Sequence, residues 1–188
     1  VADSELTTPN LVYIGEQDVE LTLTFDNTGA IPGYGPFALL YVDKTGVDGA
    51  GTEIDDGLTF KGAKYLGADV IQTEYTFDSN GEATVMLGDE EVIITAPTGF
   101  EPGDTVVYLE LPFGSFVPDQ PPADITVSLD VSDLADLGEP LNILSQTGYK
   151  FGEDPLDNVD ADPIIFEDIS TKANQTIKPQ LVELTKNY

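Results

Sequence analysis

The sequence predicts an all-β fold, a β-sandwich of mostly antiparallel strands with long acidic loops. Short runs of alternating apolar and polar residues recur along the chain, and frequent Gly (18) and Pro (13) separate them. No helical apolar period is sustained anywhere. Apolar residues make up 40% of the 188 residues, which is enough to fill a core. A closed β-barrel would show the same pattern and stays open as an alternative.

The strands are expected where the apolar pattern is clearest. Segments 19–25 and 125–131 alternate, which predicts strands with one buried face. The continuous apolar run 37–42 predicts a strand buried on both faces. A strand at 70–77 is expected to form a hairpin with 82–87, since 78–81 reads as a tight turn. Further strands are expected at 92–94, 105–111, 141–151 and 164–169, a polar loop at 43–57 and a helical turn at 134–137.

An internal echo suggests how the chain is organised. Residues 8–12 (TPNLV) resemble residues 178–182 (KPQLV). If the echo marks the period of a tandem array, 1–176 is one β-sandwich domain, and 177–188 is a linker or the first strand of a following repeat. The alternative is a chance match. Because Val1 is not a natural start, we expect the chain to be a piece of a longer protein.

The charge balance limits the partners. There are 35 Asp and Glu residues against 7 Lys, no Arg, and a net charge of -28. Nucleic acids and anionic membrane surfaces are polyanions, so neither is an expected partner. No segment is long and apolar enough to insert into a membrane. Bound divalent cations, a saline medium, or both should offset the self-repulsion, and we expect Ca²⁺ as a structural cofactor.

The chain contains neither Cys nor His. Disulfides, thiolate nucleophiles and the commonest general base are therefore excluded. Paired carboxylates remain conceivable catalysts, but among 35 acidic residues the closeness of two of them carries little information. The sequence therefore predicts a protein that is not an enzyme.

The main candidate for a metal site is the acidic loop at 152–163. Carboxylate and amide oxygens two positions apart can converge on one Ca²⁺, which takes 6–8 oxygen ligands. The loop is not an EF-hand, because its Gly and closing Glu are not at the required positions. A solvated acidic loop is the alternative. The candidate ligands are Asp154, Asp157, Asn158, Asp160 and Asp162.

Two other segments are weaker candidates. Asp78, Asn80 and Glu82 place oxygen ligands at alternate positions around Gly81, but a simple hairpin turn is the favoured explanation. The loop 43–56 could also bind a metal or a ligand, or could be a plain surface loop. Its acidic residues are Asp43, Asp48, Glu53, Asp55 and Asp56.

Three segments resemble the conserved-repeat domains, often called DUF11-like, of large bacterial and archaeal cell-surface proteins of the adhesin type. The segments are 23–29 (LTFDNTG), 102–108 (PGDTVVY) and 125–131 (ITVSLDV), the last followed by Leu137 and Gly138. The resemblance implies an immunoglobulin-like sandwich and an extracellular role in architecture or adhesion. The order departs from the family, in which the Pro-Gly-Asp-Thr segment usually precedes the Asn-Thr-Gly segment. The resemblance provides no catalytic residues.

Together these observations predict a structural or adhesive module of a long extracellular protein at the cell surface, stabilised by Ca²⁺. Its expected partners are neighbouring domains of the same chain or identical subunits. One alternative is a module that binds a glycan or a peptide through the region 30–57. Another is a subunit of a surface layer or an extracellular filament.

Overall fold

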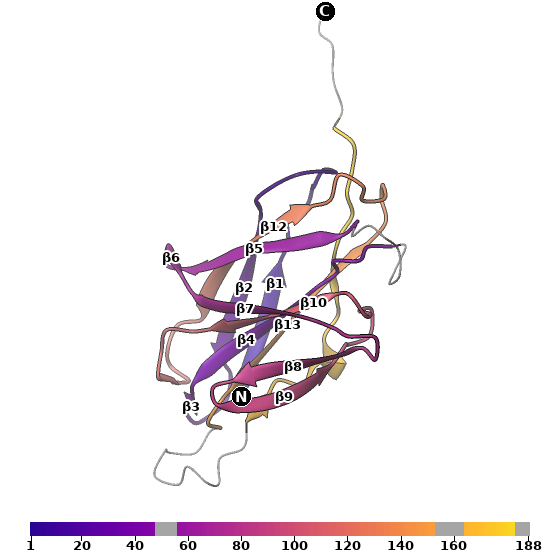
Figure 1. Cartoon of the computed structure of the whole chain (residues 1–188). Helices are drawn as coiled ribbons and strands as arrows, with labels where there is room; N and C mark the ends of the chain where they lie inside the picture. The colour runs from indigo at the N-terminus through magenta and orange to yellow at the C-terminus, as the bar shows by residue number, and fades with distance from the viewer. Residues whose placement is uncertain (48–55, 153–163, 183–188) are drawn as a thin grey trace, which may run out of the picture.

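The computed structural model describes residues 1–47, 56–152 and 164–182 (Figure 1). No α-helix is present within these ranges. The elements are β1 (Ala2–Thr7), β2 (Val19–Asn27), β3 (Gly33–Tyr34), β4 (Pro36–Val42), β5 (Leu58–Tyr65), β6 (Ala68–Asp69), β7 (Ile71–Thr76), β8 (Glu82–Leu87), β9 (Glu90–Thr95), β10 (Thr105–Glu110), β11 (Ser115–Phe116), β12 (Ala123–Val131), β13 (Leu141–Tyr149), β14 (Ile165–Phe166), the 3-10 helix η2 (Ile169–Thr171) and β15 (Gln175–Ile177).

Two antiparallel sheets form the sandwich. One has the order β1-β2-β12-β5-β6, and the other has the order β14-β13-β4-β10-β7 with β15 paired to β13. The predicted class, an all-β immunoglobulin-like sandwich, is therefore confirmed. The two sheets have separate edges, so the alternative of a closed barrel is wrong. Within this class the strand order has jelly-roll character, because most successive long strands change sheet. The hairpin β8–β9 forms a third layer over the second sheet (Figure 1).

The three layers explain the apolar pattern of the sequence. Strands β2 and β12 alternate buried with more exposed residues, as predicted. Strand β4 is buried along its whole length, because it lies in the middle layer. Its residues Ala38, Leu40 and Val42 face the core between the sheets. Phe37, Leu39 and Tyr41 face a second core beneath β8–β9. Full burial of each large apolar side chain contributes roughly 1.5–3 kcal/mol.

The predicted pairing of 70–77 with 82–87 is wrong. Strand β7 pairs with β10, and β8 pairs with β9. The turn itself forms, because the Asp78 backbone N–H donates to the Glu82 carbonyl at 2.9 Å. Beyond it, β8 leaves the sheet and buries Ala83, Val85 and Leu87 in the second core. Burial of this apolar face outweighs continuation of the hairpin.

Several elements differ from the sequence expectations. Strands β1 and β5 and the short strands β3, β6, β11 and β15 were not predicted, and 134–137 forms turns rather than a helical turn. Strand β14 lies within the predicted segment 164–169 and pairs with β13. Buried and exposed residues do not alternate regularly along β5, because a bulge shifts its register against β12 between Ser128 and Leu129.

The described chain begins and ends at opposite poles of the sandwich, marked by N and by the yellow segment that leads to C in Figure 1. At the C-terminal pole the two echo segments contact each other. The Gln180 backbone N–H donates to the Val12 carbonyl at 2.9 Å, and the Ile14 N–H donates to the Gln180 carbonyl at 3.0 Å. The proposed domain boundary after residue 176 falls inside β15, which pairs with β13. Whether a further repeat follows stays a prediction.

Candidate functional site

The sequence-predicted metal ligands fall into two groups. Asp154, Asp157, Asn158, Asp160 and Asp162 lie outside the described residues. Asp78, Asn80 and Glu82 form the exposed turn between β7 and β8. There, the Asp78 Oδ1 atom accepts hydrogen bonds from the backbone N–H groups of Asn80 at 2.9 Å and Glu82 at 3.0 Å. Gly81 adopts a left-handed φ of 73°, as a tight turn requires. The geometry is that of an Asx turn, and metal binding here stays a prediction.

Several buried or half-buried acidic side chains gather around Asp104, just before β10. Asp104 is 1% exposed. Its Oδ1 atom accepts hydrogen bonds from the backbone N–H of Lys44 at 2.9 Å, the backbone N–H of Thr45 at 3.0 Å and the Thr45 hydroxyl at 2.9 Å. Its Oδ2 atom accepts one from the Glu101 N–H at 2.9 Å. One carboxylate therefore fixes the chain after β4 against the turn before β10.

Asp43 lies beside Asp104 and is also buried. Its Oδ1 atom accepts a hydrogen bond from the Gly46 N–H at 3.1 Å, and its Oδ2 atom accepts one from the Asn142 N–H at 3.1 Å. Gly46 has a φ of +77°, and a Cβ atom at this position would lie 2.0 Å from Asp56 Oδ1. Only glycine fits there, so the turn brings the buried Asp56 carboxylate close to the backbone of Gly46.

Burial raises the pKa values of Asp43 and Asp104, and repulsion from neighbouring carboxylates adds to the rise for Asp43. Burial raises the pKa of Asp43 to about 6; the carboxylates of Asp104 and Glu101 also raise it, while hydrogen bonds from Asn142 and Gly46 oppose the rise. Burial likewise raises the pKa of Asp104, although four hydrogen-bond donors favour its charged form. We call Asp43, Asp56, Glu101 and Asp104 the acidic cluster. A nearby cation would lower both pKa values.

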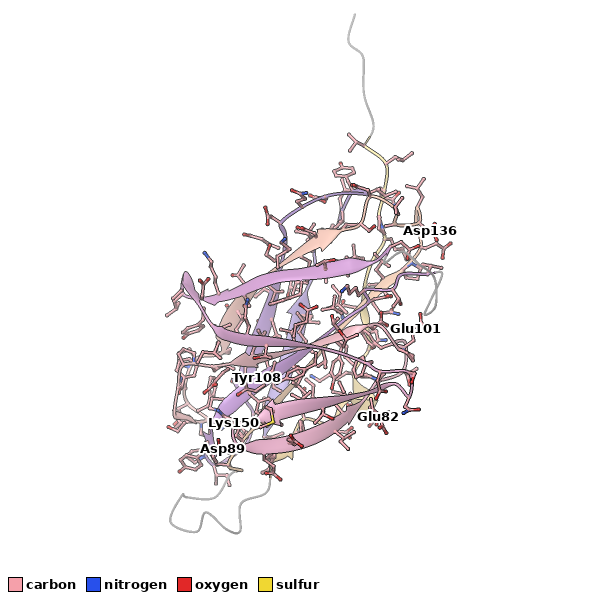
Figure 2. All side chains as sticks on the ribbon, in the orientation of Figure 1. Glu82, Asp89, Glu101, Tyr108, Asp136 and Lys150 are labelled. Atoms are coloured by element: carbon pink, nitrogen blue, oxygen red, sulfur yellow. The ribbon has the colours of Figure 1, made fainter. Side chains whose placement is uncertain are left out.

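A cleft of about 370 Å³ opens beside the acidic cluster, and Glu101, Glu139 and Asn142 contribute to its lining. Glu101 and Glu82 lie at the same side of the molecule (Figure 2), because the turn before β10 is bonded to the end of β7. The Phe77 N–H donates to the Asp104 carbonyl at 2.9 Å. Among residues 1–47, 56–152 and 164–182, however, no group of three or more Asp or Glu side chains is arranged as a metal site.

A second buried polar group joins the edges of the two sheets. Glu167 is 7% exposed. Its carboxylate accepts hydrogen bonds from the Ser4 hydroxyl at 2.7 Å and the Thr147 hydroxyl at 3.0 Å, and it pairs with the Lys172 ammonium at 2.5 Å. Ser4 also contacts the Ser145 hydroxyl at 2.9 Å. This Glu167 clasp ties β1 of the first sheet to β13 of the second.

Sequence reasoning missed both Asp104 and the Glu167 clasp. Asp104 stands in a Pro-Gly-Asp turn, in which an Asp that accepts backbone N–H groups is a recognisable signal. Glu167 has no comparable local signal, because its partners come from distant strands. The predicted glycan or peptide region 30–57 is described only in part. In it, Gly33–Tyr34 form β3, paired with β11, and Phe37 and Tyr41 are fully buried.

None of the described helices has the length and apolar character needed to cross a membrane. No protein-family model matches the sequence, and no curated protein matches it. The resemblance to surface-protein repeats therefore stays a prediction.

Some solved structures are similar to this chain at low sequence identity. AvmM, which catalyses macrocyclization in alchivemycin A biosynthesis, matches with a TM-score of 0.51 and 16% identity, over 100% of this chain and 90% of its own. The C-terminal fragment of the major pilin GBS80 of Streptococcus agalactiae matches with a TM-score of 0.37 and 12% identity, over 95% of this chain and 53% of the pilin chain. The third cohesin of ScaC from Acetivibrio cellulolyticus, in complex with the ScaB dockerin, matches with a TM-score of 0.29 and 18% identity, over 78% of this chain and 84% of the cohesin chain. At 16% identity the likeness to AvmM concerns the fold alone.

Proposed function

We propose that this chain is a structural module of a long extracellular surface protein, with no catalytic role. The observation that carries the proposal is the placement of the two ends of the described chain at opposite poles of a single sandwich (Figure 1). A module of this shape spans the distance between its neighbours in a chain of domains. Its partners are then neighbouring domains of the same protein, or identical subunits.

The terminal strands support a mechanical role. Strand β1 pairs with β2 from Ala2 opposite Asn27 to Thr7 opposite Thr22, and it runs along the long axis of the sandwich (Figure 1). Tension applied at the two ends would load these pairs along the strand rather than open them one at a time. The Glu167 clasp holds the same strand to the second sheet. A spacer under tension needs this kind of support at its first strand.

Surface localisation has a direct test. Antibodies raised against the chain should label intact, unpermeabilised cells of the source organism. Labelling only after permeabilisation would contradict the proposal. A detached form released into the medium is also compatible with an extracellular module, so the culture supernatant is examined with the same antibody.

We also propose that Ca²⁺ stabilises the module through its acidic loops. The net charge of -28 supports this proposal, since a bound cation would relieve the repulsion between carboxylates. The pKa of Asp43 is raised mainly by burial and further by the carboxylates of Asp104 and Glu101, and a cation would offset the second of these causes. A ligand that binds only the folded state raises the melting temperature by mass action. Thermal melts with Ca²⁺ and with chelator, at fixed ionic strength, should therefore differ. Equal melting temperatures, or full stabilisation by NaCl alone, would contradict the Ca²⁺ proposal.

A further inference from the structure

The hairpin between β5 and β6 ends in an unusual residue. The pairs Lys64–Asp69 and Tyr65–Ala68 leave Leu66 and Gly67 as a two-residue loop. Both have positive φ, 49° and 80°, as a type I′ turn requires. Asn and Gly are the favoured residues at such positions, whereas a leucine is uncommon. Leu66 is moreover 86% exposed. Neither backbone preference nor burial explains this leucine.

An apolar pocket lies next to Leu66. Its volume is about 610 Å³, and its lining includes Tyr65, Leu66, Ile71, Leu111 and Phe113. Tyr65 and Phe113 form an edge-to-face pair with ring centroids 5.2 Å apart, and both pack against the main core. The floor of the pocket is therefore held by the sandwich, while Leu66 and the 65% exposed Ile71 stand at its rim. A pocket of this size and character suits an apolar side chain.

Strand β7 begins at this pocket and forms the open edge of its sheet. It pairs with β10 on one side, and no strand of the described residues lies on the other. Among the described residues, no backbone–backbone hydrogen bond outside the β10 pairing involves Ile71–Thr76. Five of its six residues are exposed. An unpaired edge rich in Ile, Thr and Tyr is a template for an added strand.

Charge selects the kind of strand that would be added. The exposed carboxylates of Asp69 and Glu74 flank the pocket and the edge. The whole chain carries a net charge of -28, so a second copy would be repelled at this acidic edge. A segment with Lys or Arg would be attracted. Lysines neutralise only part of the negative charge near the pocket. Lys150 pairs with Glu110 at 3.0 Å, and Lys64 lies opposite Asp69.

From these observations we propose a peptide-binding edge. An extended, basic segment of another protein pairs with β7, places an apolar side chain in the pocket and is held at the rim by Leu66. This inference adds a binding surface to the proposed structural role and does not depend on it. The leucine at the turn is then kept for binding, at a cost in turn stability.

The test uses the full chain and three short synthetic peptides. The first alternates Lys with Val and Thr around a central Leu, the second replaces Lys with Glu, and the third carries a central Pro. NMR titration up to millimolar peptide should show shifts at Leu66, Ile71 and Phe113 with the first peptide only. Amide exchange along β7 should slow in that complex, because an added strand protects the outer N–H groups. No shifts with the basic peptide, or shifts without protection along β7, would overturn the proposal.

Substitution of Leu66 gives the sharper comparison. Leu66→Asn supplies the residue that the turn favours, so we expect the melting temperature of the free protein to rise by about 2 °C. Affinity for the basic peptide should fall at least about tenfold. Ile93→Asn is the matched control, since Ile93 is 64% exposed on β9 and does not line the pocket; it should leave binding unchanged. A lower melting temperature for Leu66→Asn would assign the leucine a structural role and overturn the inference. So would dimerisation of the free protein that Leu66→Asn abolishes.

Discussion

Ser4 and Glu167 are 163 positions apart, yet the Ser4 hydroxyl donates a 2.7 Å hydrogen bond to the Glu167 carboxylate. The Ser4 backbone N–H donates a second bond to the same carboxylate at 3.0 Å. Strand β1 stands at the edge of its sheet, where such an N–H would otherwise face water or an added strand. Glu167 thus closes the sandwich on the side where its first strand lies.

Replacing Glu167 tests this closure. In Glu167→Gln, the amide NH₂ group would face donors from Ser4 or Thr147, and the ion pair with Lys172 would be lost. Leaving buried donors without an acceptor should lower the free energy of unfolding by about 2–3 kcal/mol. Denaturant unfolding measures this change. Asp168→Asn is the matched control, because the neighbouring Asp168 is exposed and Asn caps a helix equally well. A similar loss in both variants would contradict the role given to Glu167.

A second variant tests the role of Asp104. Asp104→Asn should lower the free energy of unfolding by about 1–3 kcal/mol, because an amide NH₂ would face one of the backbone N–H groups that the carboxylate now accepts. Asp89→Asn, at an exposed position labelled in Figure 2, changes the net charge equally and should alter stability by no more than about 0.5 kcal/mol. If both variants gain stability equally, relief of bulk charge is the better explanation.

The raised pKa of Asp43 predicts a pH dependence. Its folded-state pKa of about 6 lies above the ordinary pKa of 3.8 for an aspartate, so between these values the folded chain binds more protons than the unfolded chain. Stability should therefore fall as the pH rises from about 4 to about 6, and stay low above that. Allowing for solvent screening, the contribution is roughly 1 kcal/mol. Melting curves at several pH values, without Ca²⁺, should show this slope, and Asp43→Asn should flatten it. An unchanged slope in the variant would assign the effect to other carboxylates.

Ion binding can be assigned to its loop by two variants. Asp160→Asn with Asp162→Asn should abolish the rise in melting temperature that Ca²⁺ causes. Asp78→Ala should lower stability by about 1 kcal/mol equally with Ca²⁺ and with chelator, since the Asp78 carboxylate already binds two backbone N–H groups. The opposite result, with the Ca²⁺ effect lost only in Asp78→Ala, would move the site to the turn after β7.

Much of the sandwich could be predicted from local pattern. Strands β2 and β12 show the period of two, and the continuous apolar run of β4 indicated burial on both faces. Strand β1 was missed because its inward face carries Ser4 between Ala2 and Leu6, and that serine is satisfied only by the distant Glu167. The β7–β8 hairpin was mispredicted because a turn does not specify which surface the next strand will cover.

The candidate sites were less predictable than the strands. The loop 43–57 was expected to be polar and at the surface, but Asp43 and Asp56 at its ends are buried. The Asp43 carboxylate accepts backbone N–H groups of Gly46 and Asn142, which come together only in the folded chain. The backbone strain at Leu66 could not be predicted from composition either, because it depends on the two-residue length of the hairpin loop.

The most direct test of the structural role is force spectroscopy in two pulling directions. The chain has no cysteine, so pairs of introduced cysteines give unique handles. Val1→Cys with Val182→Cys loads the sandwich from pole to pole, whereas Val1→Cys with Thr28→Cys peels β1 from β2 one pair at a time. Pole-to-pole pulling should require the higher rupture force, and Glu167→Gln should reduce it. An equal or lower force from pole to pole would contradict a module built to carry tension between its neighbours.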